Sequence, residues 1–334
     1  MLAALGLAVA GGAASAAAPG SGETIPPAPP PASYCRIAPT SGWPAIGTAP
    51  TPDLTSFQDY RDGLAIPAGS AGKGIDIADV EYEWARGHED LVSKNLPSAP
   101  ATGLSPAYRA RDHGTAVLGV LGASDNGRGV TGLAAAATLR PVSPFSPDYA
   151  PAEAIATAAK GLSRGDILLV ELQSLVVLQN GTSLLGPIEF HRSVRDAIAA
   201  AVEDGIVVIE PAGNGDLDVG GLGPSWLANP SDEPASGAIM VGAGGPGATP
   251  PDVADRARVP GSNYGERVDV QGAGAGVVTT GYSDIPGASG DRSYTACFDG
   301  TSSASATIAA AAAVVQGEAV ARTGEPLTPA QMRE

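Results

Sequence analysis

The strongest constraint on the fold is a regular alternation of short apolar runs with helical segments along the middle of the chain. Each run is rich in Val, Ile or Leu and is bounded by Gly, Pro or Asp, which is typical of a strand buried on both faces. The runs lie at residues 74–80, 138–142, 167–172, 206–209 and 238–241. The clearest helix runs from Ile188 to Asp204, with one apolar stripe that Gly205 ends. This order predicts an α/β fold, in which helices cover both faces of a mostly parallel central sheet and sites lie at the carboxyl ends of the strands.

Charge and composition exclude several classes of function. The chain carries 19 Lys and Arg against 35 Asp and Glu, a net charge of −16, so its surface would repel nucleic acid and anionic lipid. It has three histidines, and none follows His88 at zincin spacing, so metal-dependent hydrolysis is not expected. Two cysteines, Cys35 and Cys297, exclude a disulfide framework and a four-cysteine zinc site. We therefore expect a globular protein that binds no nucleic acid and, when mature, no membrane.

The two ends of the chain differ from its middle. Residues 1–16 combine an apolar run with small residues and predict a signal peptide, although no positive charge precedes the run. Residues 17–55 are rich in Pro and Ala and predict a linker or a short pro-segment. The folded domain would then span 56–334, cut short within a last helix that a capping box at Thr328 begins. No segment after the signal peptide is expected to be long enough to cross a bilayer.

Acid, histidine and serine occur along the chain in an order that suits acyl transfer. Asp79 and Glu81 end the first predicted strand, and His113 and Ser302 each open a helix. A serine hydroxyl is a poor nucleophile at neutral pH, so it needs an imidazole to take its proton and a carboxylate to hold that imidazole. Asn214, directly after a buried strand, and the backbone N–H of Ser302 could stabilise the oxyanion. His113 or Ser302 alone would be an ordinary helix-start residue, but the ordered set favours catalysis.

These segments resemble the subtilisin-like serine peptidases, or subtilases, from about Gly72 to Glu334. His113-Gly114-Thr115 with the later segment 126–134, the segment 212–214 and the segment 300–305 match the family's histidine, oxyanion and serine motifs in that order. The resemblance implies a three-layer subtilisin-like fold for residues 56–334. It also implies that Ser302 is the nucleophile, that His113 is the general base, that Asn214 is an oxyanion donor, and that no organic cofactor takes part.

The acid is the point at which the sequence departs from the family. Read without gaps from either side, the family's aspartate position falls on Glu81, and the interval of 32 residues to His113 fits better than the 34 residues from Asp79. Residues 79 and 81 of a strand point to the same face, so Asp79 stays a second candidate. Two neighbouring carboxylates would repel each other and raise the pKa of one of them. We expect Glu81 to be the partner of His113, with Asp79 as the alternative.

Further departures bear on specificity and on metal binding. Glu171 and Gln173 stand where the family usually has Ser and Gly beside the substrate, so their bulk would narrow the primary pocket, as would Glu210. The usual calcium-binding insertion in the histidine helix is missing, so no motif supports a structural calcium ion. We expect His88 in a surface turn and His191 on the polar face of its helix. Cys35 and Cys297 could form a disulfide or remain two free thiols.

These observations together predict a secreted, extracellular and monomeric serine endopeptidase that cleaves polypeptide substrates through an acyl-enzyme on Ser302. The alternative is a catalytically inactive subtilase scaffold that binds peptides or a partner protein, which the altered acid and the bulky substrate strand would favour. A lipase or esterase of the α/β-hydrolase type would need Gly-x-Ser-x-Gly and the order serine, acid, histidine, and the sequence has neither.

Overall fold

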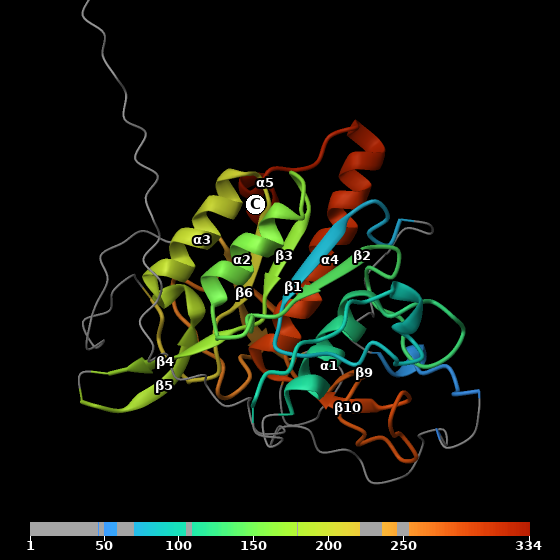
Figure 1. The fold of residues 1–334 in the computed structure, drawn as a ribbon. Coiled ribbons are helices and arrows are strands. Elements are labelled where there is room, and N and C mark those ends of the chain that lie inside the picture. Colours follow the sequence, from blue (N-terminus) through green and yellow to red (C-terminus); the bar gives the residue numbers. More distant parts are fainter. Residues whose placement is uncertain are drawn as a thin grey trace, which may run out of the picture.

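The protein is built around a six-stranded sheet in which every neighbouring pair of strands is parallel (Figure 1). The computed structural model describes residues 46, 50–58, 70–104, 109–178, 180–220, 236–245 and 254–334, so the predicted signal peptide and most of the predicted linker lie outside the described residues. Across the sheet the order is β2 (Thr138–Val142), β1 (Asp76–Val80), β3 (Ile167–Val170), β6 (Val207–Pro211), β7 (Ile239–Gly244) and β8 (Val270–Ala273).

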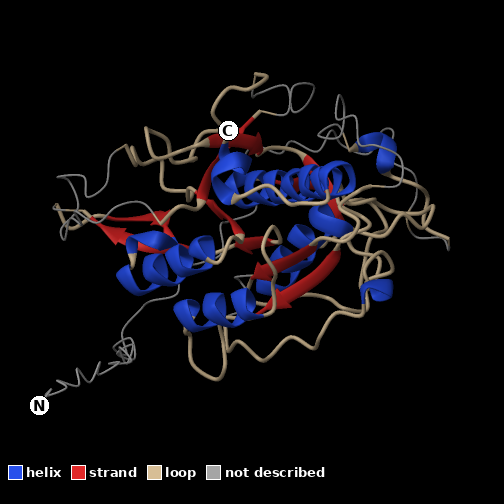
Figure 2. Ribbon diagram, turned by 90° about the horizontal axis from the view of Figure 1, so that it is seen from above, coloured by secondary structure: helices blue, strands red, loops and turns tan. Residues whose placement is uncertain are grey.

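Helices cover both faces of this sheet. In Figure 2 the long helix α4 lies on one side of the strands, and α2 and α3 lie on the other. The helices are α1 (Ala110–Gly122), α2 (Pro151–Lys160), α3 (Arg192–Glu203), α4 (Gly300–Thr323) and α5 (Pro329–Arg333), with short 3-10 turns at Thr55–Phe57, Val92–Lys94 and Ile188–Phe190. The predicted α/β architecture, a mostly parallel sheet between two helical layers, is confirmed.

The sheet separates the two largest apolar clusters of the described core. One cluster lies between the sheet and the helices α1 and α4, and the other lies between the sheet and the helices α2 and α3. The run Ile167 to Val170 shows why, because all of its side chains are buried and alternate residues enter opposite clusters. A strand with helices on both faces gains from being apolar throughout, which is the pattern of every predicted run.

Two antiparallel hairpins stand outside the main sheet. One pairs β4 (Gln173–Val177) with β5 (Ser183–Pro187), directly after β3. The other pairs β9 (Val277–Thr280) with β10 (Tyr294–Phe298), directly before α4. The first hairpin therefore follows the strand that ends just before Glu171, and the second precedes the helix that carries Ser302.

Four details of the sequence analysis need comment or correction. The helix predicted from Ile188 to Asp204 is a 3-10 turn followed by α3, and His191 between them is the N-cap of α3, not a residue of its polar face. His88 is fully buried, so the expectation of a surface turn is wrong. Its Nε2 atom bonds to the Ser293 carbonyl oxygen at 2.8 Å. The capping box predicted at Thr328 is present at the start of α5.

The fourth detail is α4, which spans 24 residues and is apolar enough to cross a membrane by length and composition, contrary to the expectation that no such segment follows the signal peptide. Of its most apolar window, 56% is buried inside the protein. Its alanines pack against α1 and the central strands, so α4 serves here as the core helix of the domain.

Candidate active site

Glu81 and His113 meet where β1 ends and α1 begins. Glu81 is the first residue after β1, and His113 lies in the first turn of α1. The Nδ1–H group of His113 donates to Glu81 Oε2 at 2.5 Å, and the backbone N–H of Tyr82 donates to Glu81 Oε1 at 2.7 Å. Gly114 permits this approach, because a Cβ atom there would lie 2.6 Å from Glu81 Cγ and 2.2 Å from a backbone oxygen. The longer glutamate side chain is thus held at both oxygens, and its free end orients the imidazole ring.

Asp79, the alternative acid, lies next to this pair without bonding to it. Its carboxyl group is completely buried, and neither oxygen has a hydrogen-bond partner among the described residues. Burial raises the pKa of Asp79 well above its usual value, and the neighbouring carboxyl groups of Glu81 and Glu171 raise it further. A raised pKa favours the neutral, protonated form of this carboxyl group. Of the two candidates, Glu81 is therefore the one that contacts His113.

The imidazole of His113 lies in an apolar surrounding with acidic groups nearby. Its ring packs edge-on against Phe298, with 5.5 Å between the ring centroids. Burial favours a lower pKa for His113, but the charge and hydrogen bond of Glu81 outweigh it, and Glu171 and Asp299 act in the same direction when they are ionised, so the pKa is raised above 6.5. A buried imidazole with one bonded carboxylate is a suitable proton acceptor for a hydroxyl group.

Ser302 lies in the first turn of α4, and Asn214 holds the start of that helix. Asn214 Oδ1 accepts from the backbone N–H of Thr301 at 3.0 Å and from its hydroxyl at 3.2 Å. Gly300 has φ = +73°, and a Cβ atom there would lie 2.9 Å from Asn214 Oδ1, so only glycine fits the turn. The backbone N–H groups of a first helical turn have no partner within the helix, so that of Ser302 is free of intrahelical bonding. The amide of Asn214 and the start of α4 therefore form one unit.

The nitrogen atoms of Asn214 face Gln173, the first residue of β4. Gln173 Oε1 accepts from the backbone N–H of Asn214 at 3.1 Å and lies 3.5 Å from its side-chain Nδ2. From its sequence position, Gln173 was expected only to narrow the primary pocket by its bulk. In the structure its carbonyl oxygen is the acceptor for the same Nδ2–H group that was predicted to bind an oxyanion.

Glu171 was expected from the sequence to narrow the primary pocket by its bulk, but its closeness to Glu81 and its contact with α4 were not predicted. It is the first residue after β3, and the parallel register of β1 and β3 pairs Val80 with Val170, so Glu81 and Glu171 follow paired positions. Ser305 donates a hydrogen bond to Glu171 Oε1. Burial raises the pKa of Glu171 to about 8, against opposing effects of His113 and of the hydroxyls of Ser305 and Ser302. The run of apolar residues directly before each glutamate was the signal that could have placed the two carboxyl groups together.

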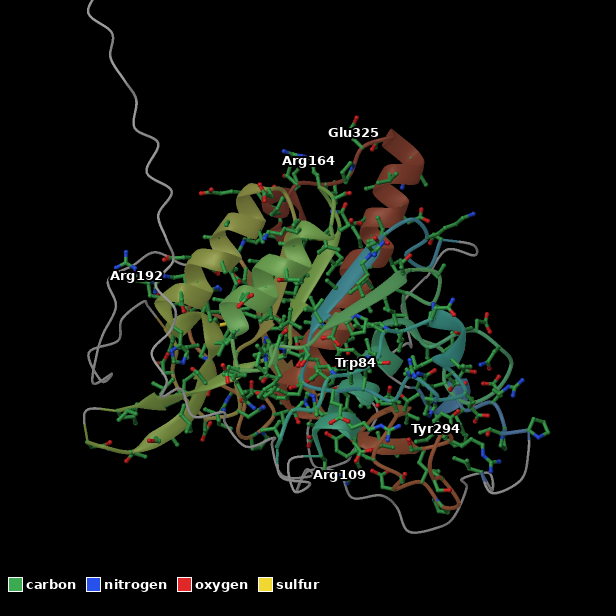
Figure 3. All side chains as sticks on the ribbon, viewed as in Figure 1. Trp84, Arg109, Arg164, Arg192, Tyr294 and Glu325 are labelled. Carbon is green, nitrogen blue, oxygen red and sulfur yellow. The ribbon has the colours of Figure 1, made fainter. Side chains whose placement is uncertain are left out.

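Glu81, His113 and Glu171 each offer one nitrogen or oxygen atom within 4.8 Å of the others. The short hydrogen bond between Glu81 and His113 already uses two of these atoms, so we interpret the group as a hydrogen-bonded proton network and do not assign a metal to it. A pocket of about 320 Å³ lies apart from this cluster. It is lined by Trp84, by the end of β2 and by the start of α2, and by none of the predicted site residues. Figure 3 labels Trp84, which lies close below the end of β1.

Two further expectations concern residues near the site. Glu210 is fully buried, and Oε1 lies 3.7 Å from Arg267, which also bonds to Glu189 at 2.7 Å. It therefore belongs to a buried ionic cluster on the sheet. Cys297, on β10, is disulfide-bonded, and the chain's other cysteine, Cys35, lies outside the described residues.

Comparison with known proteins agrees with this arrangement. A profile of the subtilase family matches residues 86–334. An extracellular protease of Xanthomonas campestris pv. campestris is 31% identical over 278 residues, which are 83% of this chain and 42% of the relative, so the chain spans less than half of that curated protein.

Solved structures show the same fold at low sequence identity. A protease from Pseudoalteromonas arctica has a TM-score of 0.61 and 21% identity over 86% of this chain and 91% of its own. A cold-adapted subtilisin-like serine proteinase has a TM-score of 0.53 and 19% identity over 80% of this chain and 82% of its own. Motif order, fold and profile agree, and the chain belongs to the subtilase family.

Proposed function

We propose that the protein is a secreted serine endopeptidase that hydrolyses peptide bonds through an acyl-enzyme on Ser302. The observation that supports this most is the buried hydrogen bond of 2.5 Å between Glu81 and His113, together with Glu171, on which both His113 and the hydroxyl of Ser302 act. Family membership and the name of the Xanthomonas relative support proteolysis and secretion. The substrates would be polypeptides, the mature protein would act as a monomer without nucleic acid or membrane, and no cofactor would be needed.

In the first half of the proposed reaction, Ser302 Oγ attacks the scissile carbonyl carbon while its proton passes to Nε2 of His113. Glu81 holds the Nδ1–H group, so that Nε2 carries the free lone pair, and its negative charge stabilises the imidazolium that forms. The negative charge on the carbonyl oxygen would be stabilised by Asn214 Nδ2 and the Ser302 backbone N–H, once substrate displaces Gln173 from Asn214.

In the second half, the imidazolium gives its proton to the leaving amine, and the C–N bond breaks to leave an ester on Ser302. Water then attacks the ester carbonyl, and His113 takes one proton from that water. Breakdown of the second tetrahedral intermediate returns the proton to Ser302 Oγ and releases the carboxylic acid. Atoms and charge balance with water as the only co-reactant.

The test is hydrolysis of an unfolded polypeptide by the purified full-length chain and by its Ser302→Ala variant. We expect new amino termini to form with wild type and not with the variant, since an alanine cannot form the ester. If both proteins cleave equally, the activity has another source and the assignment of Ser302 is wrong. N-terminal sequencing of protein recovered from the culture medium would test export.

One observation favours a second candidate, a scaffold that binds peptides without cleaving them. Gln173 Oε1 accepts from the backbone N–H and the Nδ2 group of Asn214, so one of the two predicted oxyanion donors, Nδ2, is already bonded to the protein itself. If this contact persists when peptide binds, the transition state would lack its main donor. Peptide binding by well-folded wild type, with no cleavage in the same sample, would favour the scaffold over the enzyme.

A further inference from the structure

Backbone register brings a second glutamate to the proposed active site. β1 and β3 are adjacent and parallel, Val80 pairs with Val170, and the backbone N–H of Glu171 donates to the Val80 carbonyl at 3.1 Å. Glu81 and Glu171 are therefore side by side at the carboxyl edge of the sheet. The relative placement of these two residues follows from the strands themselves, which makes it a fixed feature of the fold.

The side chain of Glu171 is buried and only half bonded. Its side chain lies beneath α4, where Ser305 donates a hydrogen bond to Oε1, and its exposed fraction is 3%. Oε2 forms no hydrogen bond of good geometry among the described residues, although the hydroxyl of Ser302 lies near enough to lower the pKa of the carboxyl group. A buried oxygen without a partner is costly for an ionised carboxylate, and it is less costly when the group carries a proton.

The groups that face Glu171 come from three elements and are mostly acidic or neutral. The end of β1 contributes Glu81 and Asp79, α1 contributes His113, and α4 contributes the hydroxyls of Ser302 and Ser305. Asp299, just before α4, also acts on His113. The basic group in this set is His113, which already forms a hydrogen bond with Glu81.

We propose that Glu171 is a positioning residue of this active site: a carboxylic acid that keeps its proton while the enzyme works and so leaves His113 free to accept the proton of Ser302. This inference rests on the proposed function. Burial, which raises the pKa of Glu171 to about 8, is consistent with a neutral group at neutral pH. Burial and the neighbouring carboxyl groups likewise raise the pKa of Asp79, next to it, well above its usual value.

The neutrality matters because charge near His113 acts on both the resting state and the transition state. If Glu171 were ionised in the resting enzyme, a second anion would favour the imidazolium before reaction, and the base would already be occupied. The same anion would lie beside the carbonyl oxygen that becomes negative, and it would oppose that charge in a site of low dielectric constant. Loss of the Glu171 proton should therefore turn the enzyme off at alkaline pH.

The first test compares the pH dependence of kcat/KM in wild type and in Glu171→Gln, whose amide has the same shape and no titration. We expect wild type to rise with the deprotonation of His113 and to fall around pH 8, as Glu171 ionises. In Glu171→Gln the fall around pH 8 should disappear while the acid limb stays in place. Glu210→Gln, which replaces another buried carboxyl group outside the site, is the matched control and should keep both limbs.

Two results would overturn the proposal. If the acid limb of Glu171→Gln moves to lower pH, Glu171 is ionised in the working enzyme and supports the imidazolium. If both limbs coincide with those of wild type, Glu171 has only a structural role. Glu171→Ser, which also removes the carboxyl group, replaces Glu171→Gln in the comparison if the amide variant does not fold.

A second test does not depend on activity. In the Ser302→Ala variant, infrared spectra recorded at a series of pH values should contain a carbonyl band of a protonated carboxylic acid that disappears around pH 8. The band should be absent from the double variant Ser302→Ala with Glu171→Gln, which separates it from Asp79. Absence of such a band in Ser302→Ala refutes the proposal even if the protein is an active peptidase, whereas failure of peptide hydrolysis in wild type with the band present refutes only the proposed function.

Discussion

Replacing Glu81 with Gln removes one charge from the site and keeps the shape of the side chain. Glu81 now accepts two hydrogen bonds, from Tyr82 N at 2.7 Å and from His113 Nδ1 at 2.5 Å. A glutamine has one acceptor oxygen and one NH2 group. If the oxygen keeps the Tyr82 bond, the NH2 group faces Nδ1, the imidazole proton must move to Nε2, and His113 can no longer accept a proton from Ser302.

The size of the effect follows from these two contacts. His113 can still accept a proton at Nε2 only if the glutamine oxygen accepts from Nδ1–H, and the NH2 group then faces the Tyr82 N–H group. Two donors then face each other, and leaving a buried donor unpaired costs about 1–3 kcal/mol. The imidazolium also loses a charge-assisted bond in a buried site, for which about 2–3 kcal/mol is a reasonable scale. The sum of about 3–6 kcal/mol corresponds to a loss of about 10²–10⁴ in kcat at 1.36 kcal/mol per tenfold change. KM should change little, because the lost interaction acts in the transition state.

The assay is steady-state hydrolysis of a fluorogenic peptide by purified wild type, Glu81→Gln and Asp79→Asn. Asp79→Asn is the matched control, because burial raises the pKa of Asp79 and its carboxyl group has no bond to His113. We expect it to keep kcat within about threefold of wild type, since a neutral acid is replaced by a neutral amide. The reasoning is refuted if Asp79→Asn loses as much activity as Glu81→Gln, or if Glu81→Gln stays within tenfold of wild type.

Four other results are expected. Asn214→Ala should lower kcat by about 10²–10³ with little change in KM, as measured by peptide kinetics, because an oxyanion donor is lost. Gln173→Ala should raise kcat/KM for the same peptide, because it frees Asn214; an unchanged or lower value would contradict this. Between pH 4.5 and about 8 the unfolded chain has lost the Glu171 proton that the folded chain keeps. The free energy of unfolding should therefore fall by about 5 kcal/mol as the pH rises through this range. Urea unfolding of Glu171→Gln at a series of pH values should lack this contribution. Arg267→Leu should cost about 3–5 kcal/mol in the same unfolding assay, because Glu189 loses its buried partner, and a second change, Glu189→Gln, should recover part of the loss.

The strands and the ordered motifs were predictable from the sequence because local pattern determines them. The run predicted at residues 138–142 coincides with β2, and the other runs overlap their strands. An apolar run between Gly, Pro or Asp residues reports burial directly, and the order of the strands along the chain leaves few parallel arrangements. Counting back from His113 without gaps also favours Glu81 over Asp79 as the acid. The 2.5 Å contact between Glu81 Oε2 and His113 Nδ1 agrees with that choice.

What the sequence did not provide depends on contacts between distant segments. His88 was expected in a surface turn, but it bonds to the Ser293 carbonyl oxygen and packs against the ring of Tyr294. Both residues lie more than 200 positions further along the chain, so the sequence around His88 does not predict its burial. The contact of Gln173 with Asn214 depends on where the end of β6 stands relative to β4. The raised pKa values of Glu171 and Asp79 depend on burial by segments that are distant in the sequence, which no local pattern reveals.

The central claim is that Glu81 and His113 activate the hydroxyl of Ser302. The most direct measurement is peptide mapping by mass spectrometry after reaction with a fluorophosphonate, which forms a stable ester with an activated serine. We predict a single adduct on the segment containing Ser302 in wild type, and slow or absent labelling of folded Glu81→Gln and His113→Ala. Labelling at another residue, or labelling of Ser302 at an unchanged rate in both variants, would contradict the account.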